Sequence, residues 1–246
     1  MRLSHAVFLL ATLAVCCARA QNSAGGATPG DPVKPVPGTS NDRLLFTVPN
    51  FLTLENAGQV PPLTTAEKLR VTARGSFDPT VFVWYGALAG IGQAENSPPS
   101  YQQGAAGYAR RYAVAFADST IENFMTKGIL PSLLREDPRY FQLGKGGFWH
   151  RAGYAVSCVF VTRTDSGNNR FNFSEVAGSA VAAAISVSYH ARGERNLPNA
   201  MSTWGTQLGF DILWAVGKEF WPDVRRKLNG SKSPEPSNAA ASGRPF

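Results

Sequence analysis

The sequence predicts a mainly α-helical protein: a compact, bundle-like domain of about six helices, with an extended N-terminal segment and disordered tails. Two observations lead to this fold class. Capping residues precede several apolar runs, and small residues recur at a spacing of four within some of these runs. The ends of the chain contain few large apolar residues, so they cannot bury enough surface to offset the entropy lost on ordering.

The N-terminus has the pattern of a cleavable secretory signal. Arg2 precedes an apolar run over residues 6–15, and the small residues Ala18 and Ala20 come directly before Gln21. We therefore expect cleavage after Ala20 and export of the mature chain to the periplasm or cell envelope.

Two alternatives to a cleaved signal are less favoured. A retained membrane anchor would need about 18 to 20 apolar residues, more than this run provides. Acylation at Cys16 would tether the chain to a membrane, but Val15 stands where a lipoprotein signal has a small residue. We therefore favour release of the chain over attachment through a lipid.

These patterns divide the chain into four parts. We expect a signal peptide over residues 1–20, a disordered leader over 21–43, a single helical domain over 44–229 and a disordered tail over 230–246. Loss of the signal lowers the formal net charge from +7 to about +5. This charge hints at a membrane surface or another anionic envelope component as partner, alongside self-association, and the absence of a dense basic stripe argues against nucleic acid.

The first elements of the domain follow from prolines and caps. Pro49 and the pair at 61–62 favour an extended segment over residues 44–62, which we expect to wrap over the core. Thr64 and Glu67 form a capping box for a helix that ends near residue 73. Asp78 then caps a helix that begins with a proline and ends near residue 96.

The remaining elements are predicted from periodicity and turn residues. A long helix over about 100–127 should end at Gly128, followed by a short helical piece over 132–136 and a flexible loop over 143–147. Residues 154–162 could form a helix or a strand, because the β-branched run over 156–161 within this apolar segment also suits a buried strand. A turn around Asp165 precedes a helix over 176–190, and a last helix over 201–229 should bend at Pro222.

Small residues four positions apart predict close helix packing. They occur in three of the expected helices: Gly86 and Gly90; Gly178, Ala182 and Ser186; Gly205 and Gly209. After the signal, none of the expected helices is both long enough and free enough of charge to cross a membrane. Cys158 is the one cysteine outside the signal, and its apolar surroundings indicate a buried, unreactive thiol.

Candidate chemistry is sparse. His150 and His190 lie outside metal-binding spacings, so we expect no metal and no cofactor. His150, Asp137 and Arg139 are weak catalytic candidates, although Arg139 more simply fixes a turn by an ion pair. Acids also occur in largely apolar helices, and two of them could act as acid and base if they converged in a cleft: Asp118, Glu122, Asp211 and Glu219.

Several segments resemble a family of uncharacterised exported bacterial proteins. They are residues 60–64, 130–134, 137–141, 148–151 and 219–223, and the similarity extends over about 46–228. The resemblance implies the bacterial envelope and no particular activity.

We therefore expect an exported, noncatalytic protein of the cell envelope that binds a partner, a lipid or its own copies. One alternative is an envelope hydrolase that uses His150 with Asp137 or Glu136, and Arg139 to hold an anion. A second alternative is an outer-membrane barrel, in which residues 154–162 and 171–189 pair as strands around the turn at Asp165.

Overall fold

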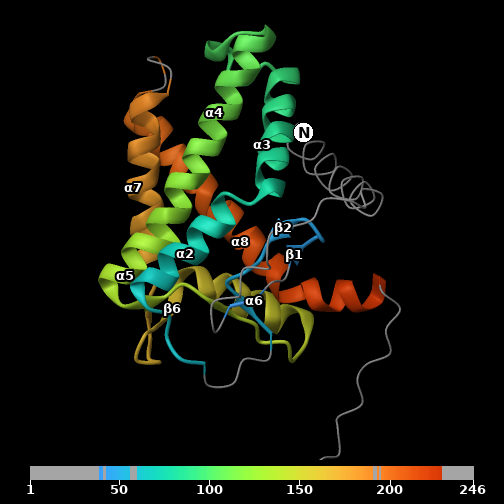
Figure 1. Cartoon of the computed structure of the whole chain (residues 1–246), viewed down its shortest axis with the longest axis vertical. Coiled ribbons are helices and arrows are strands. Elements are labelled where there is room, and N and C mark those ends of the chain that lie inside the picture. The colour runs from blue at the N-terminus through green and yellow to red at the C-terminus, as the bar shows by residue number, and fades with distance from the viewer. Residues whose placement is uncertain (1–38, 41–42, 56–59, 191–192, 194, 229–246) are drawn as a thin grey trace, which may run out of the picture.

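The computed structural model describes residues 39–40, 43–55, 60–190, 193 and 195–228. Within them, the predicted fold class is confirmed: the domain is mainly α-helical and bundle-like (Figure 1). The predicted signal peptide and tail, and most of the leader, lie outside these residues. Ser40 and Arg43, at the end of the expected leader, are held by the domain: Ser40 donates to the Asn50 carbonyl, and Arg43 pairs with Asp78 at 2.7 Å.

The helices form one upright group and one lower layer. Their bounds are α2 Thr65–Ser76, α3 Pro79–Ala94, α4 Gly104–Asn123, α5 Leu130–Leu134, α6 Phe148–Phe160, α7 Phe173–Tyr189 and α8 Leu197–Leu228. Figure 1 shows α3, α4 and α7 upright, with α8 crossing behind them and α6 across the lower end. The helix pairs α3–α4, α4–α7, α7–α8 and α6–α8 are in contact.

Both predicted N-caps are confirmed. The Thr64 side chain accepts from the Glu67 amide, and the Glu67 carboxylate accepts from the Thr64 amide, which completes the capping box of α2. Asp78 caps α3 by accepting from the Thr80 amide, with Pro79 in the first turn. Because its carboxylate also binds Arg43, Asp78 ties the extended segment to the helical domain.

The long central helix does not end at Gly128. After α4 the chain continues as a π-helical segment, η2 Phe124–Ile129, and then as α5, which ends where Arg135 takes a left-handed conformation. Gly128 is instead a packing residue, because a Cβ atom there would lie 3.1 Å from the Leu69 side chain of α2. The helix also begins later than the predicted start near residue 100, because a 3-10 turn, η1 Pro99–Tyr101, precedes α4.

Short strands close the lower end of the molecule. Their bounds are β1 Arg43–Leu44, β2 Val48–Pro49, β3 Thr53–Leu54, β4 Glu136–Asp137, β5 Tyr140–Phe141, β6 Val161–Thr164 and β7 Asn169–Phe171. The pairing of β3 with β5 confirms that the extended segment wraps over the core. The ambiguous region is a helix to Phe160 and a strand from Val161, which pairs with β7 across the predicted turn.

The small-residue prediction is confirmed in one helix and wrong in another. On α7, Gly178, Ala182 and Ser186 are buried, and a Cβ atom on Gly178 would lie 3.3 Å from the Met125 backbone. On α8, Gly205 and Gly209 are exposed and have no neighbour within 4 Å of a Cβ position. The spacing alone predicts a smooth ridge but does not say whether another helix lies on it.

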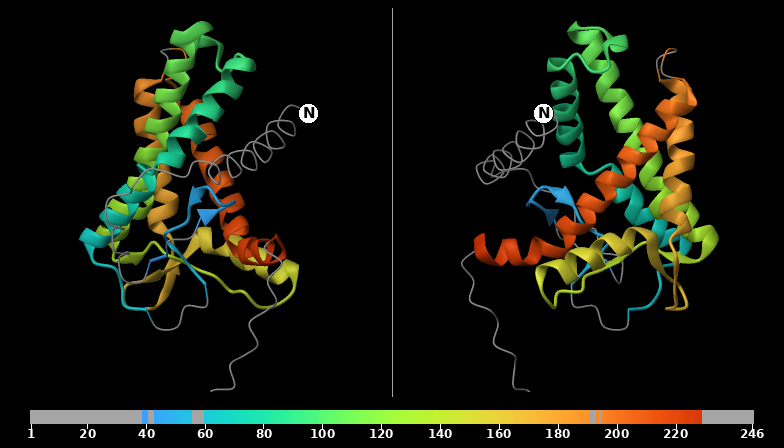
Figure 2. Two further views of the ribbon diagram at one scale, coloured as in Figure 1. Left: turned by 45° about the vertical axis from the view of Figure 1, so that its right-hand side comes forward. Right: turned by 180° about the vertical axis from the view of Figure 1, so that it is seen from behind.

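The long helix α8 bends before its last turns, as Pro222 predicts (Figure 2). Before the bend, Ala215 packs with Ala155 and Val159 of α6 and with Tyr140 in the buried core. None of the described helices combines the length and the apolar character required to cross a membrane.

Candidate functional site

Two of the sequence-predicted site residues are brought together. Asp137 and Arg139 form a buried ion pair, in which Arg139 Nη2 lies 2.6 Å from Asp137 Oδ2. Arg139 also donates to the Pro61 carbonyl at 2.9 Å. This is the turn fixed by its own ion pair that the sequence favoured. The guanidinium therefore already has a carboxylate partner at the place where the hydrolase alternative would use it to hold an anion.

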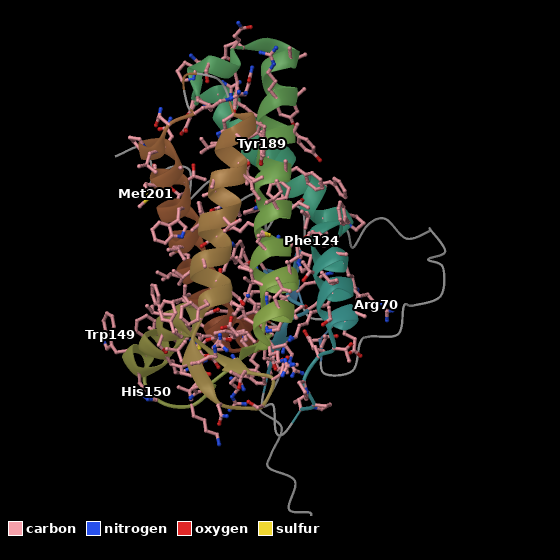
Figure 3. The ribbon with its side chains drawn as sticks, turned by 90° about the vertical axis from the view of Figure 1, so that its left-hand side faces the viewer. Arg70, Phe124, Trp149, His150, Tyr189 and Met201 are labelled. Carbon is pink, nitrogen blue, oxygen red and sulfur yellow. The ribbon has the colours of Figure 1, made fainter. Side chains whose placement is uncertain are left out.

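His150 lies apart from this pair. It is exposed in the first turn of α6, and Figure 3 shows it beside Trp149 at the outer edge of the molecule. No hydrogen bond or ion pair connects His150 to Asp137, Glu136 or Arg139 within the described part of the chain. The arrangement that the hydrolase alternative needs is thus not formed in this structure.

His190 belongs to a different cluster, in which three residue types of a catalytic triad meet. The Ser186 hydroxyl lies 3.0 Å from His190 Nε2, and Asp118 Oδ2 lies 3.1 Å from the same nitrogen. A triad needs the serine and the carboxylate on opposite ring nitrogens, so that one accepts a proton while the other is oriented. Because Ser186 also donates directly to Asp118 at 2.6 Å, the cluster is a hydrogen-bonded joint between α4 and α7.

The lower end of the molecule holds a set of paired charges, most of them buried, which we call the base network: Lys68, Glu136, Asp165, Arg151 and Glu219. Lys68 is 1% exposed, and its ammonium donates to both Asp165 oxygens at 2.8 Å and to the Glu136 carbonyl. The Glu136 carboxylate pairs with Arg170 and accepts from the Ser174 amide at the start of α7. These contacts join α2, α5, α7 and the short strands.

Glu219 is the centre of the base network. Its side chain is fully buried and accepts from Arg151 Nε at 2.8 Å, from the Tyr140 hydroxyl at 2.8 Å and from the Leu143 and Gly144 amides. The loop over 143–147 was expected to be flexible. Two of its amides are instead bound to a buried carboxylate, which explains why this glycine-rich segment has a defined place.

The upright helices line a cavity of about 960 Å³, which is partly open to solvent and reaches Glu136 of the base network. Helices α3, α4, α7 and α8 all contribute to its lining, and β2 and α6 reach its lower part. Five ionisable residues on this lining form what we call the cavity cluster: Glu122, Lys127, Glu175, Asp211 and Lys218. Protein surrounds these side chains, yet each keeps some exposed surface because it faces the cavity.

The cavity cluster contains two carboxyl groups that lie against each other. Glu175 and Asp211 are hydrogen-bonded to each other, and burial together with the charge of Asp211 raises the pKa of Glu175 well above its usual range. Two carboxylates cannot both be ionised at this separation without strong repulsion, so Glu175 retains its proton. No N–H or hydroxyl of the described residues donates to Glu175 Oε1 or Asp211 Oδ2.

The third carboxyl group and both ammonium groups are also perturbed. Burial and the charge of Asp211 raise the pKa of Glu122 from 4.5 to about 7. Burial and the neighbouring Lys127 lower the pKa of Lys218 to about 8. Burial opposes the charge of Lys127, but the surrounding carboxyl groups raise its pKa, and it donates to Asn123 Oδ1 at 2.6 Å.

The rest of the lining is largely aromatic and apolar. Trp84 of α3 and Trp214 of α8 meet edge to face, with ring centroids 6.3 Å apart, and Tyr85 lies next to Trp84 in the chain. Cys158 also reaches the cavity, but burial raises the pKa of its thiol, so it stays protonated. The thiol that the sequence predicts to be buried is only half-buried, and its raised pKa is in the direction of low reactivity. The described residues contain no group of three metal-ligating side chains placed to hold a metal ion.

Sequence reasoning had found part of this site. The acids expected to matter if they converged included Glu122 and Asp211, which do meet in the cavity, and Asp118, which lines it but is bound by Ser186. Glu219 belongs to the base network instead. Three members of the cluster, Glu175, Lys127 and Lys218, have weaker signals in the sequence. Glu175 and Lys127 lie near the ends of expected helices, where a charged residue is ordinary, and Lys218 lies beside Glu219 within α8. Comparison with models of known protein families, with curated proteins and with solved structures found no match.

Proposed function

We propose that this protein is an exported, noncatalytic binding protein of the cell envelope, which holds a small molecule in the cavity between α3, α4, α7 and α8. The observation that carries the proposal is a roomy cavity whose buried polar groups lack partners. Its volume of about 960 Å³ falls in the range of small-molecule sites, about 300 to 1,000 Å³. Aromatic walls with a few converging polar groups are also typical of such sites.

Unsatisfied groups in the lining support a binding role. Gln207 is 9% exposed, and its Oε1 atom, like Glu122 Oε1, accepts no hydrogen bond from the described residues. A buried acceptor without a donor costs about 1 to 3 kcal/mol. A ligand that supplies the donors recovers this free energy on binding, so these atoms favour an occupied cavity.

Binding can be tested by filling the cavity. Ala115 of α4 lines it, whereas Ala113 on the same helix is exposed. We expect at least one compound, from a panel of cations, anions and neutral molecules of about 200 Da, to raise the melting temperature of the wild type. Ala115→Phe should abolish that shift and Ala113→Phe should preserve it. No shift with any compound, or an unchanged shift in Ala115→Phe, would rule out the cavity as the site.

Export is supported by the pattern of the first twenty residues, which lie outside the described part of the chain. Expression of the full chain in a Gram-negative host, followed by fractionation and N-terminal sequencing, tests it. We expect a mature chain that begins at Gln21 in the periplasmic or envelope fraction. An uncleaved chain in the cytosol would contradict this part of the proposal.

A second function, attachment to an anionic membrane surface, is favoured by the aromatic end of α6. We define the aromatic end as Phe148, Trp149 and Phe220. Trp149 is 84% exposed and Phe148 is 58% exposed, and the Phe148 ring stacks on Phe220 at 5.0 Å. Exposed basic residues adjoin it in sequence: Lys145 before α6, and Arg226 and Lys227 in the last turn of α8. Aromatic rings beside cations suit the headgroup region of an anionic bilayer.

Vesicle co-sedimentation tests this attachment. The wild type should bind vesicles that contain phosphatidylglycerol and leave them at high salt, because the basic residues act through screened charges. The double variant Phe148→Ser with Trp149→Ser should lose most of this binding. Leu133→Ser is the control, since Leu133 is 72% exposed on α5. Equal binding by both variants, or equal binding to neutral vesicles, would argue against the aromatic end.

A further inference from the structure

We propose that the cavity selects an organic monocation with N–H donors, a primary ammonium compound with an apolar body. This inference rests on the proposed function, because it names the class of ligand that the same cavity binds. Three independent features lead to it: the kind of hydrogen-bonding atom left without a partner, the balance of charge, and the aromatic wall.

The vacant positions for hydrogen bonds in the cavity are mostly acceptors. Glu122 Oε1 and Gln207 Oε1 lack donors among the described residues, and Gln207 is more than nine-tenths buried. Glu175 Oε1 and Asp211 Oδ2 also lack donors among the described residues. A primary ammonium group offers three N–H donors on one atom, which matches a site where carboxyl oxygens of three helices converge.

The charge balance of the cavity cluster also favours a ligand that carries one positive charge. Three carboxyl groups face two ammonium groups, those of Lys127 and Lys218, so one negative charge is left when all five are ionised. The other acids on the lining have partners: Asp118 with His190, Glu136 with Arg170, and Asp137 with Arg139. A monocation therefore balances the cluster, whereas an anion would meet three carboxyl groups.

The wall provides a surface for the rest of such a molecule. Trp84, Tyr85 and Trp214 present aromatic rings to the same cavity. A cation within about 6 Å of an aromatic face is attracted by the electron-rich ring, and more strongly when water is excluded. The same rings bury an apolar body, so the ligand class combines an ammonium head with a hydrocarbon or aromatic part.

Binding should release a proton. In the empty cavity the excess negative charge is neutralised by protonation, since burial raises the pKa of both Glu175 and Glu122, the latter to about 7. When the ammonium group arrives with its own charge and donors, a carboxyl proton leaves to solvent and the carboxylate accepts an N–H instead. The other titratable groups on the lining are these: Tyr85, Asp118, Lys127, Glu136, Asp137, Arg139, Tyr140, Tyr154, Cys158, Arg163, His190, Asp211 and Lys218.

A matched series of three probes tests the inference by calorimetry at pH 7. The probes are 2-phenylethylammonium, the neutral 2-phenylethanol and the anionic 3-phenylpropionate, which share one body. We expect the ammonium to bind at least tenfold more tightly than the alcohol and the propionate not to bind. The binding heat of the ammonium should differ between phosphate and Tris buffers, because these buffers take up the released proton with different enthalpies.

Two substitutions shift the affinity in opposite directions. Asp211→Asn should lower the affinity for 2-phenylethylammonium at least tenfold, since it removes a carboxylate while keeping the size of the side chain. Lys218→Met should raise the affinity for 2-phenylethylammonium about fivefold, because it removes a competing cation. Damage to the fold could not produce such a gain in affinity. Glu95→Gln, at an exposed carboxyl group after α3, should change nothing.

The outcomes separate this inference from the proposed function. Preference for the alcohol or the propionate would overturn the ammonium class but leave a small-molecule cavity. Binding of the ammonium that neither Asp211→Asn nor Lys218→Met alters would place it outside the cavity and overturn the inference. No binding by any of the three probes overturns the inference as well, while the proposed function then stands or falls on the Ala115→Phe panel.

Discussion

The molecule buries charge in two different ways, and the contrast between them separates structure from function. In the base network each charge has an opposite partner at hydrogen-bond distance, as Glu219 has in Arg151 and Lys68 has in Asp165. In the cavity cluster, like charges face one another, and Glu122 Oε1 has no donor among the described residues. The two regions adjoin, because Glu136 of the base network also lines the cavity.

The difference follows from what buried charge costs. Moving an ion out of water carries a penalty of several kcal/mol, which only good pairing geometry offsets. The base network meets that condition and connects segments that are distant in the chain, such as Arg151 and Glu219. The cavity cluster does not meet it, so its residues lower the stability of the empty protein. A region that reduces stability in this way is where a binding role is expected.

The largest expected effect is on unfolding free energy. Glu219→Gln should destabilise the protein by about 3 to 5 kcal/mol, because it leaves Arg151 without its buried carboxylate. Asp211→Asn should change stability by less than about 1 kcal/mol, since the amide oxygen still accepts a hydrogen bond and the repulsion between acids falls. Urea denaturation of the two variants measures both. Similar losses in the two variants would remove the distinction between the regions.

The second largest expected effect is on the pH dependence of the unfolding free energy. Folded Glu122 holds its proton up to about pH 7, whereas the unfolded chain releases it near 4.5. Raising the pH through this window therefore lowers stability, by about 3 kcal/mol for this one group. Glu122→Gln should flatten the pH dependence of the unfolding free energy over that range. Stability that rises from pH 5 to 7 in the wild type, or an unchanged slope in the variant, would contradict the placement of Glu122.

Below pH 4.5 the pH dependence of stability has the opposite sign, so that stability falls as the pH falls. Burial acts to raise the pKa of Asp223, but hydrogen bonds and charge from Arg151 and Arg226 outweigh it and lower the pKa. Burial of Asp78 is outweighed in the same way by Arg43 and by hydrogen bonds from Thr80, so its pKa is also lowered. Stability from these pairs is present above about pH 3.8 and is lost as the pH falls further. The wild type should therefore be most stable near pH 5, which a series of thermal melts would reveal.

The smallest effect compares two tyrosines. Tyr140→Phe should cost about 1.5 to 3 kcal/mol, because its hydroxyl donates to the buried Glu219 carboxylate at 2.8 Å. Tyr85→Phe should cost less than about 1 kcal/mol, since Tyr85 faces the cavity, where water can replace its hydrogen bond with Ser119. Chemical denaturation provides both values. The reverse order would show that the cavity side of the bundle is the more tightly organised one.

Much of the fold was predictable because its signals are local. The capping box at Thr64, the cap at Asp78 and the bend at Pro222 depend on neighbours within one helical turn, and all three are confirmed. The end at Gly128 was wrong for a tertiary reason: the glycine makes room for Leu69 of another helix. The ion pair of Arg139 could also be anticipated, since its carboxylate partner lies two residues away.

The cavity could be predicted only in part, because it is assembled from helices that are distant in the chain. Glu122, Glu175 and Asp211 come from α4, α7 and α8, and the sequence does not state which faces of these helices meet. A charged residue within an apolar helix was the available signal, and it identified Glu122 and Asp211. The same signal also selected Glu219, which is structural. Only the presence or absence of partners, seen in three dimensions, distinguishes these acids.

The most direct measurement is the titration of the Glu122 carboxyl carbon by NMR in the protein without ligand. We predict an apparent pKa of about 7, as expected for an acid buried beside Asp211 without a paired cation, and a lower value once 2-phenylethylammonium is added. An apparent pKa at or below 4.5 in the free protein would mean that Glu122 is solvated or paired. The contrast between a satisfied base and an unsatisfied cavity would then be lost.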